Sequence, residues 1–272
     1  MGVSVDVTSD NFTTEVVEAS YERPVLVDFF AQWCGPCQML KPILEKLVQE
    51  YDFILAKIDI DQNPAIANAY RIEGVPDVRI VSQGQMYQGF VGVLPEPKLR
   101  ELLAQLNLKS NLEVSLEAAQ QAAASGNVQQ GKVLFQQLLT TYPQNPKITI
   151  AAAKFLIEQD ELSEAERLLA SVEEYDRQYY PQAEALGQLM QLKSDSQRPP
   201  QHELDQPFAQ AVSRTLSGNY EEALQEFLAI VGKNRKYRDD GARKAMVMIF
   251  TLLGDEHPLT RQYRKQLTLT LF

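Results

Sequence analysis

The sequence predicts a chain of two domains that differ in fold class. The first is an α/β domain with a central mixed sheet flanked by helices, and the second is an all-α domain built from helical repeats. Two observations lead to this prediction. Strand and helix patterns alternate through residues 1–108, and strand patterns stop after residue 110. Because 272 residues also suit two domains of ordinary size, we predict domains over 1–108 and 112–272.

The core of the first domain is expected to begin with a strand and a helix. The segment PVLVDFF at 24–30 has the β-branched and aromatic side chains of a buried central strand. The segment at 37–51 places apolar side chains at helical spacing, and Pro42 inside it is expected to interrupt and kink that helix. A second apolar strand follows at 53–61.

The rest of the first domain predicts a helix, a hairpin and a closing helix. Asn63 and Pro64 suit the N-cap and first turn of a helix over 63–72. The expected hairpin over 77–92 turns at Gln83-Gly84, and a helix over 96–108 closes the domain. This order implies a mixed sheet with helices on both faces.

After residue 110, helical patterns follow one another and repeat. Gly126, Asp160 and Gly218 align as turn positions, and the first two lie 34 residues apart, which is the period of a tetratricopeptide repeat. The matching helix positions are Ala119, Ala153 and Ala211 before the turns, and Phe135, Leu169 and Phe227 after them. The third unit comes 58 residues after the second. The residues beyond the 34-residue period surround the polar segment 194–207, which is expected to form a loop or irregular insertion.

Composition excludes several classes of function. A net charge of -10 argues against nucleic acid as the main partner. The chain lacks an apolar run of the roughly 20 residues that span a bilayer, and its start has no secretory pattern, so we expect a cytoplasmic protein with no membrane partner. The segment from Lys233 is basic. It is either a solvated surface with cations near helix ends or a docking patch for an acidic partner.

The chain has two cysteines, Cys34 and Cys37, separated by Gly-Pro. In a reducing compartment such a pair indicates redox chemistry or metal binding rather than a structural disulfide. A zinc site needs about four ligands, and the two histidines, His202 and His257, lie far away in the sequence. We therefore expect no metal and no cofactor other than a redox-active Cys34–Cys37 disulfide.

The position of the pair suits thiol–disulfide exchange. Cys34 follows a predicted strand and opens a predicted helix, whose free N–H groups and partial positive charge favour a thiolate. Cys37 lies one turn further on, where it can attack a mixed disulfide formed by Cys34. The alternative is a reduced and inert pair.

The segment VDFFAQWCGPCQMLKP resembles the active-site segment of thioredoxin, and the resemblance extends over residues 1–108. It implies that Asp28 is the buried acid that helps to take the proton of Cys37, and that Lys57 is its partner. From the residues alone, Asp28 could also be an exposed acid at a strand end.

The same resemblance implies a substrate-binding surface around the cysteines. It includes a cis-proline loop at Val75-Pro76, although a trans turn proline is the alternative on base rates. The residues it assigns to this surface are Trp33, Gly35, Pro36, Val75, Pro76 and Gly92; Gly84 also matches a glycine of the family. Asp77 departs from the family pattern, since thioredoxins usually carry threonine there. A carboxylate close to Cys34 would raise the thiol pKa.

The whole chain resembles the bacterial YbbN family, or chaperedoxins, including the ending RQYRKQLTLTLF. The resemblance implies a co-chaperone that holds unfolded or cysteine-containing clients and passes them to chaperonin and Hsp70 systems. Some members lack the first cysteine, whereas this chain keeps both, so disulfide reduction with thioredoxin or glutathione as reductant is expected.

Three hypotheses about function remain open. The first is a thiol–disulfide oxidoreductase whose repeats recruit protein substrates, since stacked helix pairs usually bind protein. The second is a redox-independent holdase or chaperone adaptor, in which the cysteine pair is secondary. The third is a scaffold that holds a dimer or fixes the first domain, and it leaves the intact Trp-Cys-Gly-Pro-Cys motif without a role. We favour a function that combines the first two.

Overall fold

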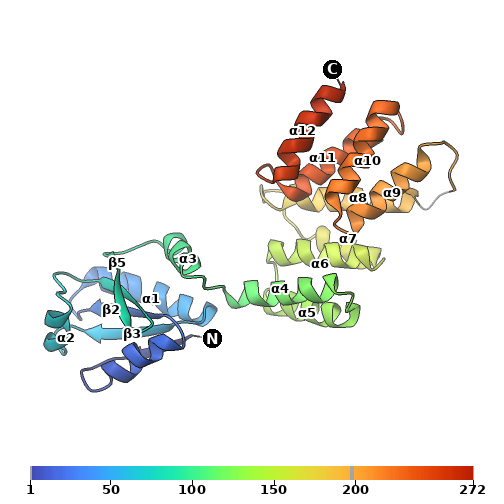
Figure 1. Cartoon of the computed structure of the whole chain (residues 1–272). Helices are drawn as coiled ribbons and strands as arrows, with labels where there is room; N and C mark the ends of the chain where they lie inside the picture. Colours follow the sequence, from blue (N-terminus) through green and yellow to red (C-terminus); the bar gives the residue numbers. More distant parts are fainter. Residues whose placement is uncertain (1, 197–198, 272) are drawn as a thin grey trace. The chain divides into compact units, whose positions relative to one another are not determined.

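The fold is that of a computed structural model, which describes residues 2–196 and 199–271. The described residues form two compact units, Met1–Glu117 and Ala118–Phe272. The first unit is a thioredoxin-type α/β fold, and the second is a helical repeat array (Figure 1). Both predicted fold classes are confirmed.

The first unit is built around a five-stranded sheet with the strand order β1-β3-β2-β4-β5. The first three strands in this order are parallel. β4 pairs antiparallel with β2, and β5 pairs antiparallel with β4. Its elements are β1 (Val3–Asp6), η1 (Thr13–Glu18), η2 (Ala19–Tyr21), β2 (Val25–Phe30), α1 (Gly35–Glu50), β3 (Ile54–Asp59), α2 (Pro64–Ala69), β4 (Asp77–Ser82), β5 (Gln85–Val91), α3 (Glu96–Gln105) and the start of α4 (Asn111–Ala124).

Alternation along β2 sends side chains to two apolar layers. Leu26 packs with α1 and α3 on one face of the sheet, whereas Val25, Val27 and Phe29 pack with the η1 and α2 side on the other. Asp28 lies two residues after Leu26 and therefore faces α1. This alternation places a carboxyl group under the helix that carries the cysteines.

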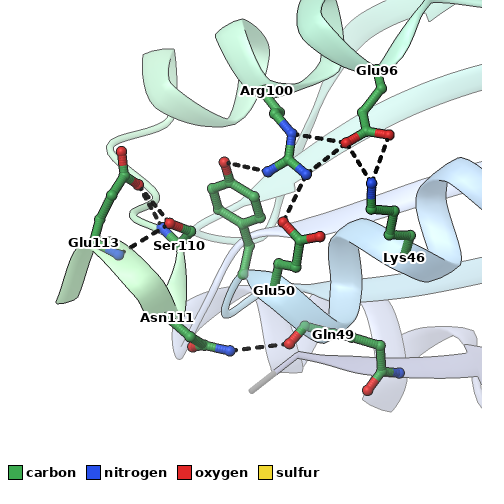
Figure 2. Close-up of polar contacts among 9 residues, drawn as sticks. Lys46, Gln49, Glu50, Glu96, Arg100, Ser110, Asn111 and Glu113 are labelled. Carbon is green, nitrogen blue, oxygen red and sulfur yellow. Dashed lines mark hydrogen bonds and ion pairs between the residues drawn. The ribbon is translucent and has the colours of Figure 1, made fainter. Parts of the chain in front are cut away.

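Polar contacts attach α3 and the start of α4 to the C-terminal end of α1 (Figure 2). Arg100 of α3 reaches Glu50 at 2.7 Å and Glu96 at 2.6 Å. Ser110 and Glu113 form a capping box, with the Ser110 N–H donating to Glu113 Oε2 at 2.8 Å and the Glu113 N–H donating to Ser110 Oγ at 3.2 Å. All of these residues belong to the first unit, so the unit extends beyond its last thioredoxin-type helix.

The second unit consists of helices packed as pairs. The aligned turn positions Gly126, Asp160 and Gly218 all have positive φ, and the aligned alanines before them are fully buried. Leu169 is only half-buried, unlike Phe135 and Phe227. The remaining helices are α5 (Val128–Thr141), α6 (Pro146–Glu158), α7 (Leu162–Leu169), α8 (Tyr180–Ser196), α9 (Asp205–Leu216), α10 (Tyr220–Lys233), α11 (Gly241–Leu253) and α12 (Pro258–Leu271).

Three local expectations need correction. Helix α1 runs without interruption through Pro42; this proline is exposed, so water can reach the carbonyl group that its missing N–H leaves unpaired. Asn63 stands at the N-cap of α2, but its side chain donates to the Asp59 carbonyl at 3.1 Å instead of capping the helix. The loop expected over 194–207 is shorter than predicted, because α8 extends to Ser196 and α9 begins at Asp205, whereas residues 199–204 are irregular; residues 197 and 198 lie outside the described part of the chain.

Candidate active site

The two cysteines lie at the junction of β2 and α1. Cys34 is the N-cap of α1 in an extended conformation, and Pro36 occupies the first turn, where its missing N–H costs nothing. The Cys37 N–H donates to Cys34 Sγ at 3.1 Å. The two sulfurs form a disulfide, so the structure is the oxidised state of the pair.

Both cysteines are shielded from solvent in the oxidised, disulfide-bonded state. Cys34 and Cys37 are buried and pack with Ala31, Ile60 and Val75. A Cβ atom built at Gly35 would meet nothing within 4 Å, so the spacer residue opens to solvent between the two cysteines. The surface beside Cys34 is therefore open at Gly35.

Asp28 is a buried carboxyl group on the α1 side of the sheet. Its residue exposure is 3%, and among the described residues Oδ1 has no protein hydrogen-bond partner. Burial raises its pKa from 3.8 to about 7, because a charged carboxylate is poorly solvated there, and the positive charges of Lys41 and Lys57 oppose that shift. A carboxyl group with a pKa near neutrality can act as a proton acceptor at physiological pH.

A loop with a cis peptide bond faces the cysteines. Val75-Pro76 is cis, and the Val75 carbonyl oxygen lies 3.7 Å from Cys34 Sγ. The Gly92 N–H donates to the Pro76 carbonyl at 2.8 Å, and Gly92 has a φ of 86°, which glycine adopts readily. The structure therefore brings Val75, Pro76 and Gly92 together beside Cys34.

Comparisons with known proteins agree with this geometry. A family model described as thioredoxin matches residues 3–105, and two models described as tetratricopeptide repeat match residues 122–189 and 182–272. The chain is 41% identical over 97 residues to a thioredoxin of Chlorobaculum thiosulfatiphilum, a match that covers 35% of this chain and 88% of that protein. The chain belongs to the thioredoxin family. It is also 39% identical over 105 residues to thioredoxin 1 of Synechococcus elongatus, covering 38% of this chain and 96% of that protein.

The thioredoxin domain exposes an aromatic side chain next to Cys34. Trp33 is 71% exposed, and its indole N–H donates to Asp61 Oδ2 at 2.9 Å, which fixes the ring. Val91 and Val93, on either side of Gly92, are also exposed. The exposed valines were not expected from the sequence, because an alternating strand does not reveal which of its faces stays uncovered.

Lys57, which was expected to partner Asp28, forms its ion pairs with other carboxylates, although its positive charge still lowers the pKa of Asp28. The two residues are in register on β3 and β2, but Lys57 Nζ lies 3.0 Å from Glu45 Oε1 and 3.4 Å from Asp6 Oδ1. Burial lowers the pKa of Lys57, whereas its hydrogen bond to Glu45 and the nearby carboxylates raise it, and the net pKa lies above the ordinary value. The long side chain of Lys57 thus reaches Glu45 and Asp6 rather than Asp28, its neighbour in register on β2.

Asp77 was expected to place a negative charge close to Cys34. In the thioredoxin domain this residue is buried, and it accepts two hydrogen bonds from Arg79 at 2.6 and 2.7 Å. Such a bidentate pair balances the carboxylate charge within β4. The negative charge that the sequence placed at this position is therefore accompanied by the positive charge of Arg79.

Within residues 2–196 and 199–271, no group of three or more histidine, cysteine, aspartate or glutamate side chains could hold a metal ion. Over the same residues, every helix is too short or too polar to cross a membrane.

Proposed function

We propose that this protein is a thiol–disulfide oxidoreductase that reduces disulfides in protein clients, and that its helical repeats bind those clients or other chaperones. The observation that supports the reductase role most directly is the disulfide between Cys34 and Cys37. It is held at a helix N-terminus, above the buried carboxyl group of Asp28 and opposite the cis-proline loop.

The first half of the reaction uses Cys34 in the reduced protein. The Cys37 N–H and the positive end of α1 stabilise a thiolate at Cys34. This thiolate attacks one sulfur of the client disulfide, and the other client sulfur leaves as a thiolate. The product is a mixed disulfide between Cys34 and the client, whose backbone can lie along Val75, Pro76 and Gly92.

The second half releases the client. The Asp28 carboxylate takes the proton of the Cys37 thiol, and the Cys37 thiolate attacks Cys34 Sγ. The second client sulfur leaves as a thiolate, so two electrons have passed from the two cysteines to the client. The Cys34–Cys37 disulfide is the product, and a thiol reductant such as thioredoxin or glutathione returns it to the dithiol.

A turbidity assay tests the reductase role. The purified protein with dithiothreitol is expected to accelerate the precipitation of insulin, and Cys34→Ser is expected to reduce the rate to that of dithiothreitol alone. Lys98→Ala, which removes an exposed ion pair with Glu101, is the matched control and should keep the full rate. A wild-type rate no higher than that of Cys34→Ser would refute the proposal.

The co-chaperone role rests on the helical repeats and on the resemblance to chaperedoxins. Repeat arrays of this kind present extended surfaces to proteins. We infer that the clients are unfolded or cysteine-containing proteins, that chaperonin and Hsp70 systems receive them, and that the protein works in the cytoplasm, where thiols stay reduced.

A second candidate function is a holdase that needs no cysteine chemistry. It is favoured by apolar side chains that the second unit exposes, among them Val133, Tyr175 and Leu269, because holding an unfolded chain needs apolar contact rather than a thiol. The basic segment from Lys233 gives weaker support for an acidic partner. Several of its cations already have carboxylate partners, in the pairs Arg238–Asp205, Arg243–Asp240, Lys244–Asp239, Arg261–Glu256 and Arg264–Asp255.

A further inference from the structure

A cavity of about 450 Å³ connects the resolving cysteine with the buried acid of the thioredoxin domain. Its walls include Cys37 and Lys41 from α1, Asp28 from β2 and Lys57 from β3. A proton that moves from the Cys37 thiol to Asp28 can do so within this cavity. The charges that line it therefore act on that transfer.

The positive charge of Lys57 is offset where it stands. Its ammonium group lies between Glu45 and Asp6, at 3.0 and 3.4 Å, and the Ser4 hydroxyl donates to the same Glu45 oxygen at 2.9 Å. The cluster of Lys57, Glu45 and Asp6 therefore acts on Asp28 with one positive and two negative charges. Lys57 is thus poorly placed to balance the charge of an ionised Asp28.

Lys41 is placed differently. It follows Cys37 by four residues on α1 and so lies one turn further along the same helix face, and it lines the same cavity. Its side chain is exposed, and across residues 2–196 and 199–271 its ammonium group makes no hydrogen bond or ion pair. Its charge therefore acts on the cavity without a carboxylate partner to offset it.

We propose that Lys41 is a positioning residue of the exchange reaction: its ammonium group, more than that of Lys57, determines how much of Asp28 is ionised near neutral pH. The charged groups around the cavity are Lys41 and Glu45 on α1, Lys57 and Asp59 on β3, and Asp6 on β1. Among them, Lys41 lowers the pKa of Asp28 most strongly, followed by Lys57, whereas Glu45 raises it. The consequence for Cys37 rests on the proposed reductase function, whereas the effect on Asp28 does not.

Titration of Asp28 in the oxidised full-length protein tests this inference directly. The chemical shift of its 13C-labelled carboxyl carbon, assigned by its loss in Asp28→Asn, is followed from pH 5 to pH 10. Lys41→Met should raise the titration midpoint by about half a pH unit or more, as expected for the removal of one positive charge that lines the same cavity as Asp28. Lys57→Met should raise it less, and Lys41→Arg should leave it near the wild-type value.

Lys46→Met is the matched control, because it removes the same charge from the same helix at a residue paired with Glu96. It should leave the midpoint unchanged. An unchanged midpoint in Lys41→Met, or a larger rise in Lys57→Met than in Lys41→Met, would overturn the inference. The readout requires no catalytic activity, so failure of the insulin assay and failure of this inference are separate results. If the reductase function holds, the pH dependence of mixed-disulfide resolution should move with the midpoint.

Discussion

Burial and charge act in opposite directions on the carboxyl group of Asp28. Burial disfavours the ionised form, whereas Lys41 and Lys57 favour it, and the result is a pKa of about 7 compared with 3.8 for an ordinary aspartate. Between these two pH values the folded protein keeps a proton that the unfolded chain has released. The folded state therefore loses stability as the pH rises through this window.

The first prediction concerns this loss. Asp28→Asn removes the titrating group, so its free energy of unfolding relative to wild type should increase from about pH 4 to about pH 7 and then level off. A shift from 3.8 to about 7 corresponds to a total change on the order of 4 kcal/mol. Denaturant unfolding of both oxidised proteins at a series of pH values measures it.

The control for the loss of one carboxyl group is Asp10→Asn, a change at an exposed position. Its unfolding free energy relative to wild type should stay constant over the same pH range. If the difference for Asp28→Asn were equally constant, the carboxyl group would not titrate in the way that its burial implies.

At the scale of elements, the turns between paired helices depend on left-handed backbone conformations. Gly126 and Gly218 have φ of 77°, and Asp160 has φ of 66° at the equivalent position. A left-handed conformation costs about 1–2 kcal/mol for a residue with a Cβ atom. At Asp160 an ion pair with Lys193 at 2.9 Å accompanies it.

The second prediction separates this conformational cost from packing. A Cβ atom at Gly218, and likewise one at Gly187 within α8, would meet nothing within 4 Å. Gly218→Ala should destabilise the protein by about 1–2 kcal/mol, whereas Gly187→Ala should stabilise it by about 0.5–1 kcal/mol, because alanine favours a helix interior. Thermal unfolding of the two variants measures both changes, and changes of equal sign would contradict the conformational explanation.

The strength of a local pattern decides which elements the sequence could predict. β2, β3 and the hairpin of β4 and β5 have apolar runs or a clear turn, and the structure places them where they were expected. β1 was missed, because the four residues VSVD give too short a pattern and become a strand only by pairing with β3. Its Asp6 then approaches Lys57.

The same limit explains the differences at the site. The sequence could place Cys34 at a helix start and Asp28 on a buried strand, because both follow from local patterns. It could not predict that Lys57 contacts Glu45, since that contact depends on which carboxylate a long side chain reaches in three dimensions. The cavity that includes Lys41 likewise exists only once α1 lies over the sheet.

At the scale of the whole molecule, the two proposed functions are assigned to different units of the chain. The residues of the proposed exchange reaction lie in Met1–Glu117, and the repeats that match tetratricopeptide models begin at residue 122. If both proposed functions exist, a variant that loses disulfide reduction should keep client holding, and a variant that loses client holding should keep disulfide reduction. The separation can be tested with variants that change one unit at a time.

The last prediction uses a client that contains no cysteine. The Cys34→Ser/Cys37→Ser variant should suppress aggregation of this client on heating as well as wild type does, because holding depends on apolar surface. It should have no insulin reductase activity. A chain that ends at Glu117 keeps the Ser110–Glu113 capping box and should show the reverse, with full reduction of insulin and no suppression of aggregation. Light scattering at equal protein concentrations measures suppression. Protection by the shortened chain would show that the repeats are not the holding element, and loss of protection in the double variant would show that holding needs the cysteines.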